Sequence, residues 1–139
     1  ELSFASDVQC TQPLSPVEFV SSDSPWRVSE VAKAFDGSSQ TAWVSSCAPC
    51  LSRSAFLGQR FEATVLVRCV NLRHAQEIDY RPASLDLERW DEGWRFVASF
   101  RNLFGGTIQL SPTWEAAGTR FVVSNRVATL GGWRLAELR

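Results

Sequence analysis

The chain has 139 residues, of which 45% are hydrophobic and 21% are charged, and its formal net charge is -1. These values are typical of a globular domain with one core, so we expect a single domain over residues 1–139. Lys33 is the only lysine and the arginines are scattered, which argues against a nucleic-acid partner or an anionic bilayer, and no apolar stretch approaches the about 20 residues of a transmembrane segment.

The chain starts with Glu1-Leu2-Ser3, which is neither an initiator methionine nor a signal peptide, and we interpret it as a processed or excised piece. The first distinctive segment is AFDGSSQTAW, residues 34–43. It is too short for a helix, and its Asp-Gly pair predicts a tight turn. The oxygens of this turn either cap the backbone or surround a hard cation, and both alternatives stay open at this point.

Four cysteines form the next group, and three interpretations compete. CAPC, residues 47–50, allows thioredoxin-like redox chemistry, but that chemistry requires a helix N-terminus in an α/β fold. Cys47, Cys50, Cys69 and His74 offer a ligand set that zinc accepts, yet one extended strand would hold the last two ~16 Å apart. Two disulfides are favoured, because an even number of cysteines fits an oxidising compartment.

The remaining segments have the pattern of a β protein. Short runs rich in β-branched and aromatic residues alternate with turn residues, as in residues 95–100 and 119–125. The clearest hairpin is 84–100, where Asp91-Glu92-Gly93 joins two strands, and 102–120 is either a long connection or an irregular strand pair. With no helical pattern longer than about two turns, we predict an all-β fold with less than about a tenth of its residues in helix.

The last segment, WRLAELR, places Trp133, Leu135 and Glu137 on one face of a strand. A carboxylate on this apolar face needs a partner. An arginine, backbone amides, or a cation that the Asp36 loop also binds would each supply one.

The residues quoted so far resemble the discoidin domains, also called coagulation-factor (F5/8) type C domains, which are galactose-binding-like jelly rolls. AFDGSSQTAW follows their A-x-DG-x-x-x-T-x-W signature. The strands expected to follow the signature correspond, in order, to residues 54–61, 66–74, 85–94 and 133–138. The resemblance covers about Val31 to Arg139 and implies an antiparallel β-sandwich of eight strands, with ligand-binding loops at one end.

Many discoidin relatives contain a structural calcium ion between the Asp-Gly loop and the closing strand. By resemblance, its ligands here are Asp36, Thr41 and Glu137, with Ser38 or Ser39 and loop carbonyls as further donors. Calcium-binding relatives often have a second Asp or Asn where this chain has Ser38, so one charged ligand is missing.

The expected fold also implies a disulfide pairing and a compartment. In that fold CAPC opens the strand beside Cys69, so we expect Cys69 to pair with Cys47 or Cys50 and Cys10 to pair with the other; a bridge from Cys47 to Cys50 would close only a tiny loop. Discoidin relatives commonly join their termini by a disulfide, whereas the four cysteines here are Cys10, Cys47, Cys50 and Cys69, so the covalent framework departs from that pattern. We expect an extracellular, cell-surface or other oxidising lumenal location.

Aromatic and basic residues suggest where a ligand binds. Trp43, Trp94 and Trp133 fall in core positions of the family. Trp26 follows a Ser-Pro turn and Trp114 lies in the loop SPTWEAAG, so both are candidates for exposed stacking surfaces.

The polar contacts of the same site are expected from the connection after the strand 66–74. Its candidates are Arg73, His74, Tyr80 and Arg81.

These features predict a binding module rather than an enzyme. His74, the only histidine, has no nucleophile motif near it in the sequence. By resemblance, the domain binds a carbohydrate, a glycoprotein or a lipid head group through loops at one end of the sandwich. The alternative is a structural subunit that docks into a larger protein assembly without a small-molecule ligand. The expected partner is thus a glycan or a protein.

Overall fold

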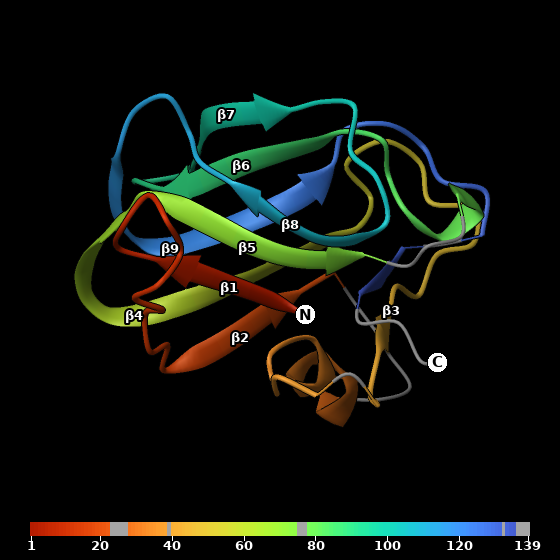
Figure 1. Ribbon diagram of the computed structural model, residues 1–139, viewed down its shortest axis with the longest axis horizontal. Helices are drawn as coiled ribbons and strands as arrows, with labels where there is room; N and C mark the ends of the chain where they lie inside the picture. The colour runs from red at the N-terminus through yellow and green to blue at the C-terminus, as the bar shows by residue number, and fades with distance from the viewer. Residues whose placement is uncertain (23–27, 39, 75–77, 132, 136–139) are drawn as a thin grey trace.

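The computed structural model describes residues 1–139 except 23–27, 39, 75–77, 132 and 136–139. Within this part of the chain, two sheets of five strands pack face to face (Figure 1). The elements are β1 (Leu2–Ala5), β2 (Glu18–Ser21), the 3-10 helix η1 (Val28–Ala34), β3 (Trp43–Val44), β4 (Phe56–Val67), β5 (Cys69–His74), the 3-10 helix η2 (Ile78–Tyr80), β6 (Leu85–Trp90), β7 (Trp94–Phe100), β8 (Gly106–Leu110), β9 (Ala116–Asn125) and β10 (Arg134–Leu135).

The first sheet has the order β1-β5-β10-β3, and β8 also pairs with β5; the second has the order β2-β4-β9-β6-β7. All the strand pairs of the described residues are antiparallel, which confirms the predicted β-sandwich, although it has ten strands where the resemblance implied eight. The helices of the described residues are two short 3-10 segments, as the sequence pattern predicted. No helix of these residues is long and apolar enough to cross a bilayer.

Two details of the strand prediction can now be judged. The hairpin at 84–100 is confirmed, because Trp90 pairs with Trp94 around the turn Asp91-Glu92-Gly93. The segment 102–120 is not a strand pair: β8 belongs to the first sheet and β9 to the second, so residues 111–115 cross between the sheets.

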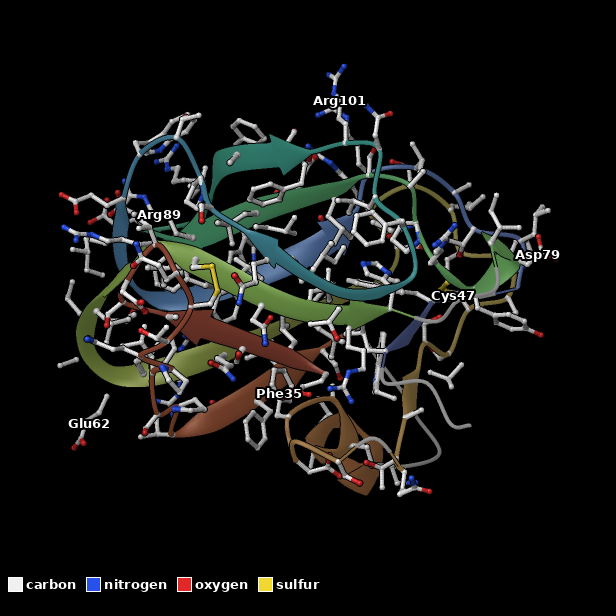
Figure 2. The ribbon with its side chains drawn as sticks, viewed as in Figure 1. Phe35, Cys47, Glu62, Asp79, Arg89 and Arg101 are labelled. Atoms are coloured by element: carbon white, nitrogen blue, oxygen red, sulfur yellow. A yellow bond between two sulfur atoms is a disulfide. The ribbon has the colours of Figure 1, made fainter. Side chains whose placement is uncertain are left out.

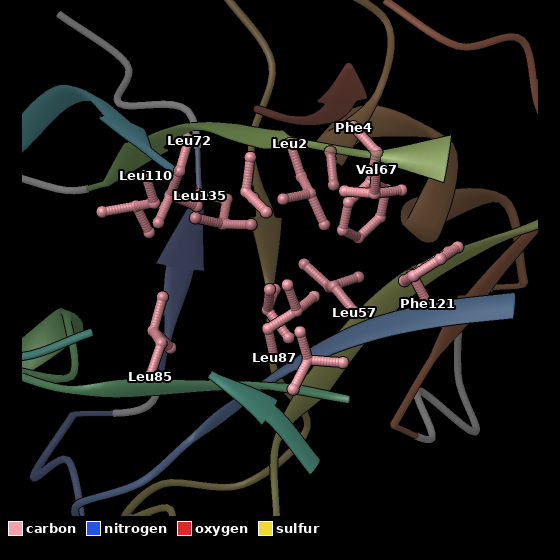
Figure 3. Packing of buried hydrophobic residues seen from close by; sticks show 14 of the residues in the cluster. Leu2, Phe4, Leu57, Val67, Leu72, Leu85, Leu87, Leu110, Phe121 and Leu135 are labelled. Atoms are coloured by element: carbon pink, nitrogen blue, oxygen red, sulfur yellow. The ribbon is translucent and has the colours of Figure 1, made fainter. Parts of the chain in front are cut away.

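The core lies between the two sheets and follows from strand alternation. Leu2 and Phe4 of β1 and Leu72 of β5 point inward from the first sheet, and Leu87 and Phe121 point inward from the second (Figure 3). The rings of Phe4 and Phe121, 5.9 Å apart between centroids, connect the sheets. Each such fully buried apolar side chain contributes roughly 1.5–3 kcal/mol to stability.

Two buried tryptophans close one end of this core, as the family positions implied. Trp43 and Trp133 are fully buried and their rings meet edge to face, with 5.8 Å between centroids. Trp133 donates its backbone N–H to the Ser45 hydroxyl (2.9 Å), so the start of β10 is connected to the segment after β3.

The strand directions separate the connecting loops into two ends. The CAPC end is formed by residues 45–55, 78–84, 101–105 and 126–131, and the Trp114 end is formed by residues 6–17, 91–93 and 111–115. Figure 1 shows them at the right and the left of the molecule, and in Figure 2 Cys47 and Asp79 mark the first.

The disulfides join Cys10 to Cys69 and Cys47 to Cys50, so the predicted pairing was wrong. Cys69 opens β5 at the Trp114 end, beside Ala5 and the loop that contains Cys10. CAPC lies at the opposite end, because β10 connects the region after β3 to His74, the last residue of β5. The length of β5 therefore separates Cys69 from Cys47 and Cys50. All four sulfurs are bonded in pairs, which also contradicts the zinc alternative.

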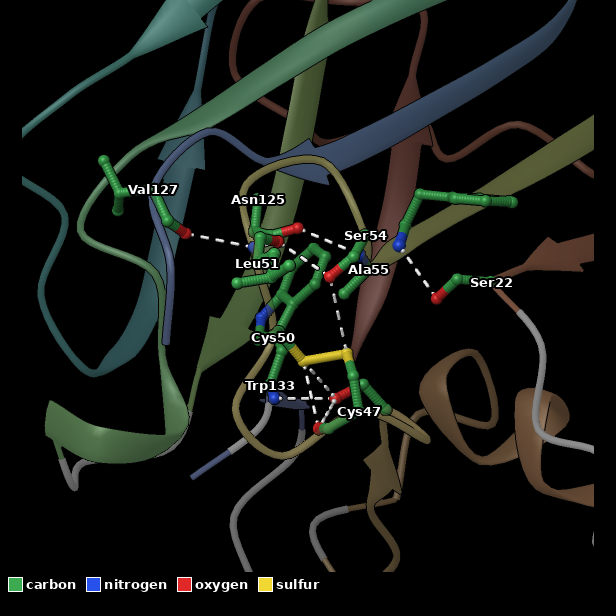
Figure 4. The surroundings of a disulfide bond; sticks show 11 residues. Ser22, Cys47, Cys50, Leu51, Ser54, Ala55, Asn125, Val127 and Trp133 are labelled. Atoms are coloured by element: carbon green, nitrogen blue, oxygen red, sulfur yellow. Dashed lines mark hydrogen bonds between the residues drawn. A yellow bond between two sulfur atoms is a disulfide. The ribbon is translucent and has the colours of Figure 1, made fainter. Parts of the chain in front are cut away.

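The CAPC loop is anchored by Asn125, a fully buried residue at the end of β9 (Figure 4). Its side-chain amide donates to the carbonyls of Leu51 (2.7 Å) and Val127 (3.0 Å), and its side-chain oxygen accepts the backbone N–H of Ala55 (2.9 Å). Because every polar group of the buried amide has a partner, Asn125 stabilises the segments around the disulfide instead of destabilising the core.

Candidate functional site

The Asp-Gly loop folds around the carboxylate of Asp36. One carboxylate oxygen accepts the backbone N–H of Ser38 (2.8 Å), and the other accepts the Thr41 hydroxyl (2.6 Å). Gly37 has a φ of 70°, in the left-handed region where glycine is favoured. Burial alone would raise the pKa of Asp36, but the hydrogen bonds from Thr41 and Ser38 lower it overall. These oxygens converge, as the sequence predicted, and they already cap the turn.

The described residues do not by themselves complete a calcium site. Calcium takes six to eight oxygen ligands, whereas this loop brings one carboxylate, and its two oxygens already accept hydrogen bonds. Nowhere in the described part of the chain do three acidic, histidine or cysteine side chains cluster as metal ligands would. Glu137 and Ser39, two of the predicted ligands, lie outside the described residues. Calcium binding therefore stays a prediction.

His74 is not a surface contact, which corrects the sequence prediction. It faces the core from β5, is fully buried, and stacks on Trp133 with 6.1 Å between ring centroids. Neither ring nitrogen has a hydrogen-bond partner among the residues that the structure describes. Burial, together with the positive charges of the N-terminal amino group and Arg81, lowers the pKa of His74 to about 3. The ring is therefore neutral at pH 7 and enclosed away from any ligand at the surface.

The buried His74 makes stability depend on pH in a defined direction. An unfolded histidine has a pKa of about 6.5, so between that pH and the native pKa of about 3 the unfolded state binds more protons. We predict that lowering the pH from 7 to 5 costs the native state about 2 kcal/mol through this residue. His74→Phe should lose correspondingly less stability over the same interval, as measured by urea denaturation at both pH values.

The comparison with His74→Phe is needed because the amino group of Glu1 titrates in the same direction. Burial lowers its pKa to about 5, so it also favours the unfolded state as the pH falls. Equal losses in the two proteins would show that His74 does not titrate as described.

The other predicted contacts near β5 are divided between two environments. Arg73 points to the opposite face of the strand from His74, where it pairs with Glu1 (3.6 Å) and donates to the Thr107 hydroxyl (3.3 Å). Tyr80 and Arg81 are half-buried at the CAPC end, in and after η2. Trp26 lies outside the described residues.

Trp114 lies at the other end of the sandwich, so the predicted grouping with Tyr80 and Arg81 is wrong. The reason is the direction of β8, which starts opposite His74 and ends opposite Val70, carrying the chain away from the CAPC end. Trp114 is 53% exposed and lies beside a pocket of about 140 Å³. The lining residues are Val8, Arg68, Pro112, Thr113, Trp114 and Glu115.

The loop that carries Trp114 is held in place on both sides. Arg68 donates two hydrogen bonds to one carboxylate oxygen of Glu115 (2.8 and 2.5 Å). The Ser111 hydroxyl donates to the carbonyl of Val8 (2.9 Å), in the loop that the Cys10 disulfide joins to β5. These contacts therefore hold the loop that positions the exposed indole of Trp114.

A larger groove, of about 370 Å³, opens on the outer face of the second sheet, and the sequence did not predict it. Its lining residues are Arg53, Phe56, Glu88, Trp94, Val122 and Ser124. Trp94 was expected in the core but is 42% exposed. The register of the hairpin shifts at a β-bulge between Leu87 and Glu88, and Trp94 then shares the outer face with Glu88 and Phe96.

Comparison with known proteins supports the fold. No protein-family model matches the chain, and no curated protein matches its sequence significantly. Among solved structures, a chitosan-binding module of a chitosanase/glucanase from Paenibacillus sp. IK-5 has a TM-score of 0.65 at 22% identity, covering 86% of this chain and 90% of that one. The CBM32 domains of Clostridium perfringens ZmpB have a TM-score of 0.71 at 12% identity, covering 88% of this chain and 33% of that one.

A third similar structure is the family 32 carbohydrate-binding module of Clostridium perfringens NanJ, in complex with galactose. It has a TM-score of 0.60 at 14% identity and covers 86% of this chain and 88% of that one. At these identities the similarity concerns the fold alone, which is an antiparallel β-sandwich like that of these binding modules.

Proposed function

We propose that this chain is a non-catalytic recognition domain that binds a glycan at the Trp114 end of the sandwich. The observation that carries the proposal is the indole of Trp114, 53% exposed beside a pocket. An exposed indole presents an apolar face to the C–H groups of a sugar ring and an N–H donor to a hydroxyl group. Because its loop is already ordered, little conformational entropy is lost on binding.

The polar groups next to Trp114 suit the same ligand. Arg68 and Glu115 line the pocket as a donor and an acceptor for sugar hydroxyl groups. Further support comes from the similar structures, one of which is named as a chitosan-binding module and another as a complex with galactose.

A glycan array run with the intact chain and its Trp114→Ala variant tests this proposal. Losing the stacking surface should weaken binding to the preferred glycan roughly tenfold. Phe104→Ala is the matched control, because Phe104 is similarly exposed, at 58%, but lies at the CAPC end. Undiminished binding by Trp114→Ala, or an equal loss in the control, would contradict a site at Trp114.

The absence of catalysis belongs to the same proposal. The only histidine of the chain is enclosed in the core, where it has no access to a substrate. The proposal that the domain is non-catalytic would be overturned if the chain converted a glycan that it binds on the array, and if a point substitution that preserves the fold abolished this turnover.

A second candidate function is docking into a protein assembly. It is favoured by the apolar rings on the outer face of the second sheet, where Trp94 is 42% and Phe96 56% exposed. A blank glycan array, together with stoichiometric capture of one protein from native extract that Phe96→Ala prevents, would favour this candidate.

We also propose that the Asp-Gly loop binds a structural calcium ion, with ligands from Asp36, Ser38, Thr41, loop carbonyls and Glu137. The support is the convergence of the Asp36 and Thr41 oxygens to 2.6 Å on a half-exposed loop. Added calcium should raise the melting temperature, since an ion that binds only the native state stabilises it, and Asp36→Asn should remove this increase. An identical melting temperature with calcium and with chelator would identify the loop as an ordinary hydrogen-bonded turn.

The proposed compartment is extracellular, at a cell surface or in another oxidising lumen. Its support is the pair of disulfides, which persist under oxidising conditions. Partners in a larger complex belong to the second candidate function.

A further inference from the structure

We propose that the groove on the outer face of the second sheet is a second glycan site, which binds an uncharged or amino sugar unit against Trp94. This inference rests on the proposed recognition of glycans, but it places a separate site away from Trp114. The groove lies over the middle of the sheet, because Glu88 of β6 pairs with Val122 of β9 and Asp86 with Ser124.

The shape of the groove fits a small polar ligand. Its volume of about 370 Å³ is within the range of ligand pockets, roughly 300–1,000 Å³. Phe56 and Val122 form apolar parts of the lining, while Arg53, Glu88 and Ser124 contribute polar groups. Apolar surface with a few placed polar groups is the usual composition of a specific binding site.

Trp94 supplies a preformed stacking surface. Its ring meets that of Trp90 edge to face, with 5.3 Å between centroids, and the guanidinium of Arg120 lies over Trp90 at 5.6 Å. These contacts restrict the Trp94 side chain before any ligand arrives, while 42% of it stays exposed. Stacking of a ligand on this restrained ring therefore costs less side-chain entropy than stacking on a ring that is mobile before binding.

Two polar groups of the groove have no partner among the described residues. Ser124 is 5% exposed, yet its hydroxyl makes no hydrogen bond in the structure. An unsatisfied buried hydroxyl is unfavourable, and a ligand hydroxyl in the groove removes that penalty. Glu88 is half-buried and its carboxylate forms no hydrogen bond or ion pair with the described residues. Both groups are thus available to a hydrogen-bonding ligand.

Arg53 adds a positioned donor at the border of the groove. Its backbone adopts a left-handed φ of 61°, and its N–H donates to the carbonyl of Asn125 (2.6 Å). Its guanidinium is held by the buried Asp86 (3.1 Å), which also accepts from Ser99 (2.6 Å) and Arg126 (3.2 Å). Because one side of the guanidinium is fixed by Asp86, its remaining N–H groups face defined directions.

Together these groups select a class of ligand. The indole of Trp94 matches the C–H face of a pyranose. The acceptor Glu88, the donor Arg53 and the hydroxyl of Ser124 match its hydroxyl groups. A purely apolar ligand would leave the Glu88 carboxylate desolvated without a partner, which is costly. A uronate or sulfated sugar would place a negative charge beside Glu88, whereas a neutral or amino sugar would not.

The indole N–H resonances of ¹⁵N-labelled protein test the site. Each of the six tryptophans gives one signal, and those of Trp94 and Trp114 are assigned from their loss in Trp94→Phe and Trp114→Phe. The intact chain is titrated with oligomers of glucose, xylose, mannose, galactose and glucosamine, and with a galacturonate oligomer. We expect the Trp94 signal to shift saturably with at least one uncharged or amino sugar and not with the galacturonate.

Substitutions separate the groove from its surroundings. Trp94→Ala and Glu88→Gln should each weaken this binding about tenfold, and Trp114→Ala should leave it unchanged. Phe96→Ala is the matched control on the same strand, since Phe96 is exposed but does not line the groove. Glu88→Gln keeps the test decisive if Trp94→Ala fails to fold.

The possible results separate this proposal from the proposed function. If the Trp114 signal shifts and the Trp94 signal does not, the groove is not a glycan site, although glycan recognition at Trp114 stands. If neither signal shifts with any oligomer, both proposals fail. A protein partner whose capture Trp94→Ala abolishes, with no sugar bound in the groove, also overturns the second site.

Discussion

Replacing Cys10 and Cys69 together by alanine should lower the free energy of unfolding by about 4 kcal/mol, against about 2 kcal/mol for replacing Cys47 and Cys50. The difference follows from the sequence separation of the bonded residues, which is 59 in the first pair and 3 in the second. A bridge across a long segment removes more conformational freedom from the unfolded chain than a bridge across a short one.

Urea denaturation of the two double variants under identical conditions measures this difference. Each variant keeps the other disulfide, so each serves as a control for the loss of two cysteines. The account would be contradicted if the two double variants lost equal free energies of unfolding, or if the variant without Cys47 and Cys50 lost more. Either the assigned pairing or the explanation through the unfolded state would then be wrong. Non-reducing peptide mapping of the unmodified chain should find the same two pairs.

Gly58→Ala should destabilise the fold by about 3 kcal/mol or more, because the added methyl group has no room. A Cβ atom at position 58 would lie 2.0 Å from the carbonyl oxygen of Phe121 and 2.6 Å from a methyl carbon of Val122. Gly58 belongs to β4, which is paired on both sides by β2 and β9, so neither the strand nor its neighbour can move without loss of ladder hydrogen bonds.

Gly118→Ala is the matched control for this substitution. Gly118 is also buried, in β9, but a Cβ atom there would make only ordinary contacts, the shortest with a ring carbon of Phe121 at 3.4 Å and another with the Cβ atom of Arg89 at 3.7 Å. We expect its stability to stay within about 1 kcal/mol of the unmodified chain. Thermal denaturation of both variants measures the contrast, and a Gly58→Ala protein as stable as Gly118→Ala would show that β4 and β9 do not approach as described.

The fold was predictable because its signals are local. Alternation in segments such as residues 119–125 places Phe121 and Val123 in the core, and the Asp-Gly turn recurs with the hydrogen bonds that its side chains suggested. Trp43 and Trp133 were likewise expected to be buried from their place in the discoidin-like pattern, and they are.

What the sequence did not reveal depends on register and on strand direction. The cysteine pairing depends on which end of β5 faces CAPC, and no residue of either segment encodes that. The exposure of Trp94 depends on a β-bulge at Val97 of β7, which alternation cannot indicate. His74 is a different case: it was predicted as a polar contact of the connection after its strand, although its alternation with Val70 and Leu72 in the sequence already indicates the inward position that the structure shows.

The groove was beyond sequence reasoning for a further reason. Its lining comes from four strands and the segment before β4, brought together only by the order β4-β9-β6-β7. Neither Glu88 nor Ser124 stands out in the sequence. That the described residues give neither side chain a partner becomes visible only when the neighbours are placed.

The central claim is that this sandwich binds glycans, and calorimetric titration of the intact chain with the best glycan from the array tests it most directly. We predict saturable binding and recovery of the glycan with unchanged mass. No saturable heat with any array glycan, or shorter products in the recovered sample, would contradict non-catalytic glycan recognition.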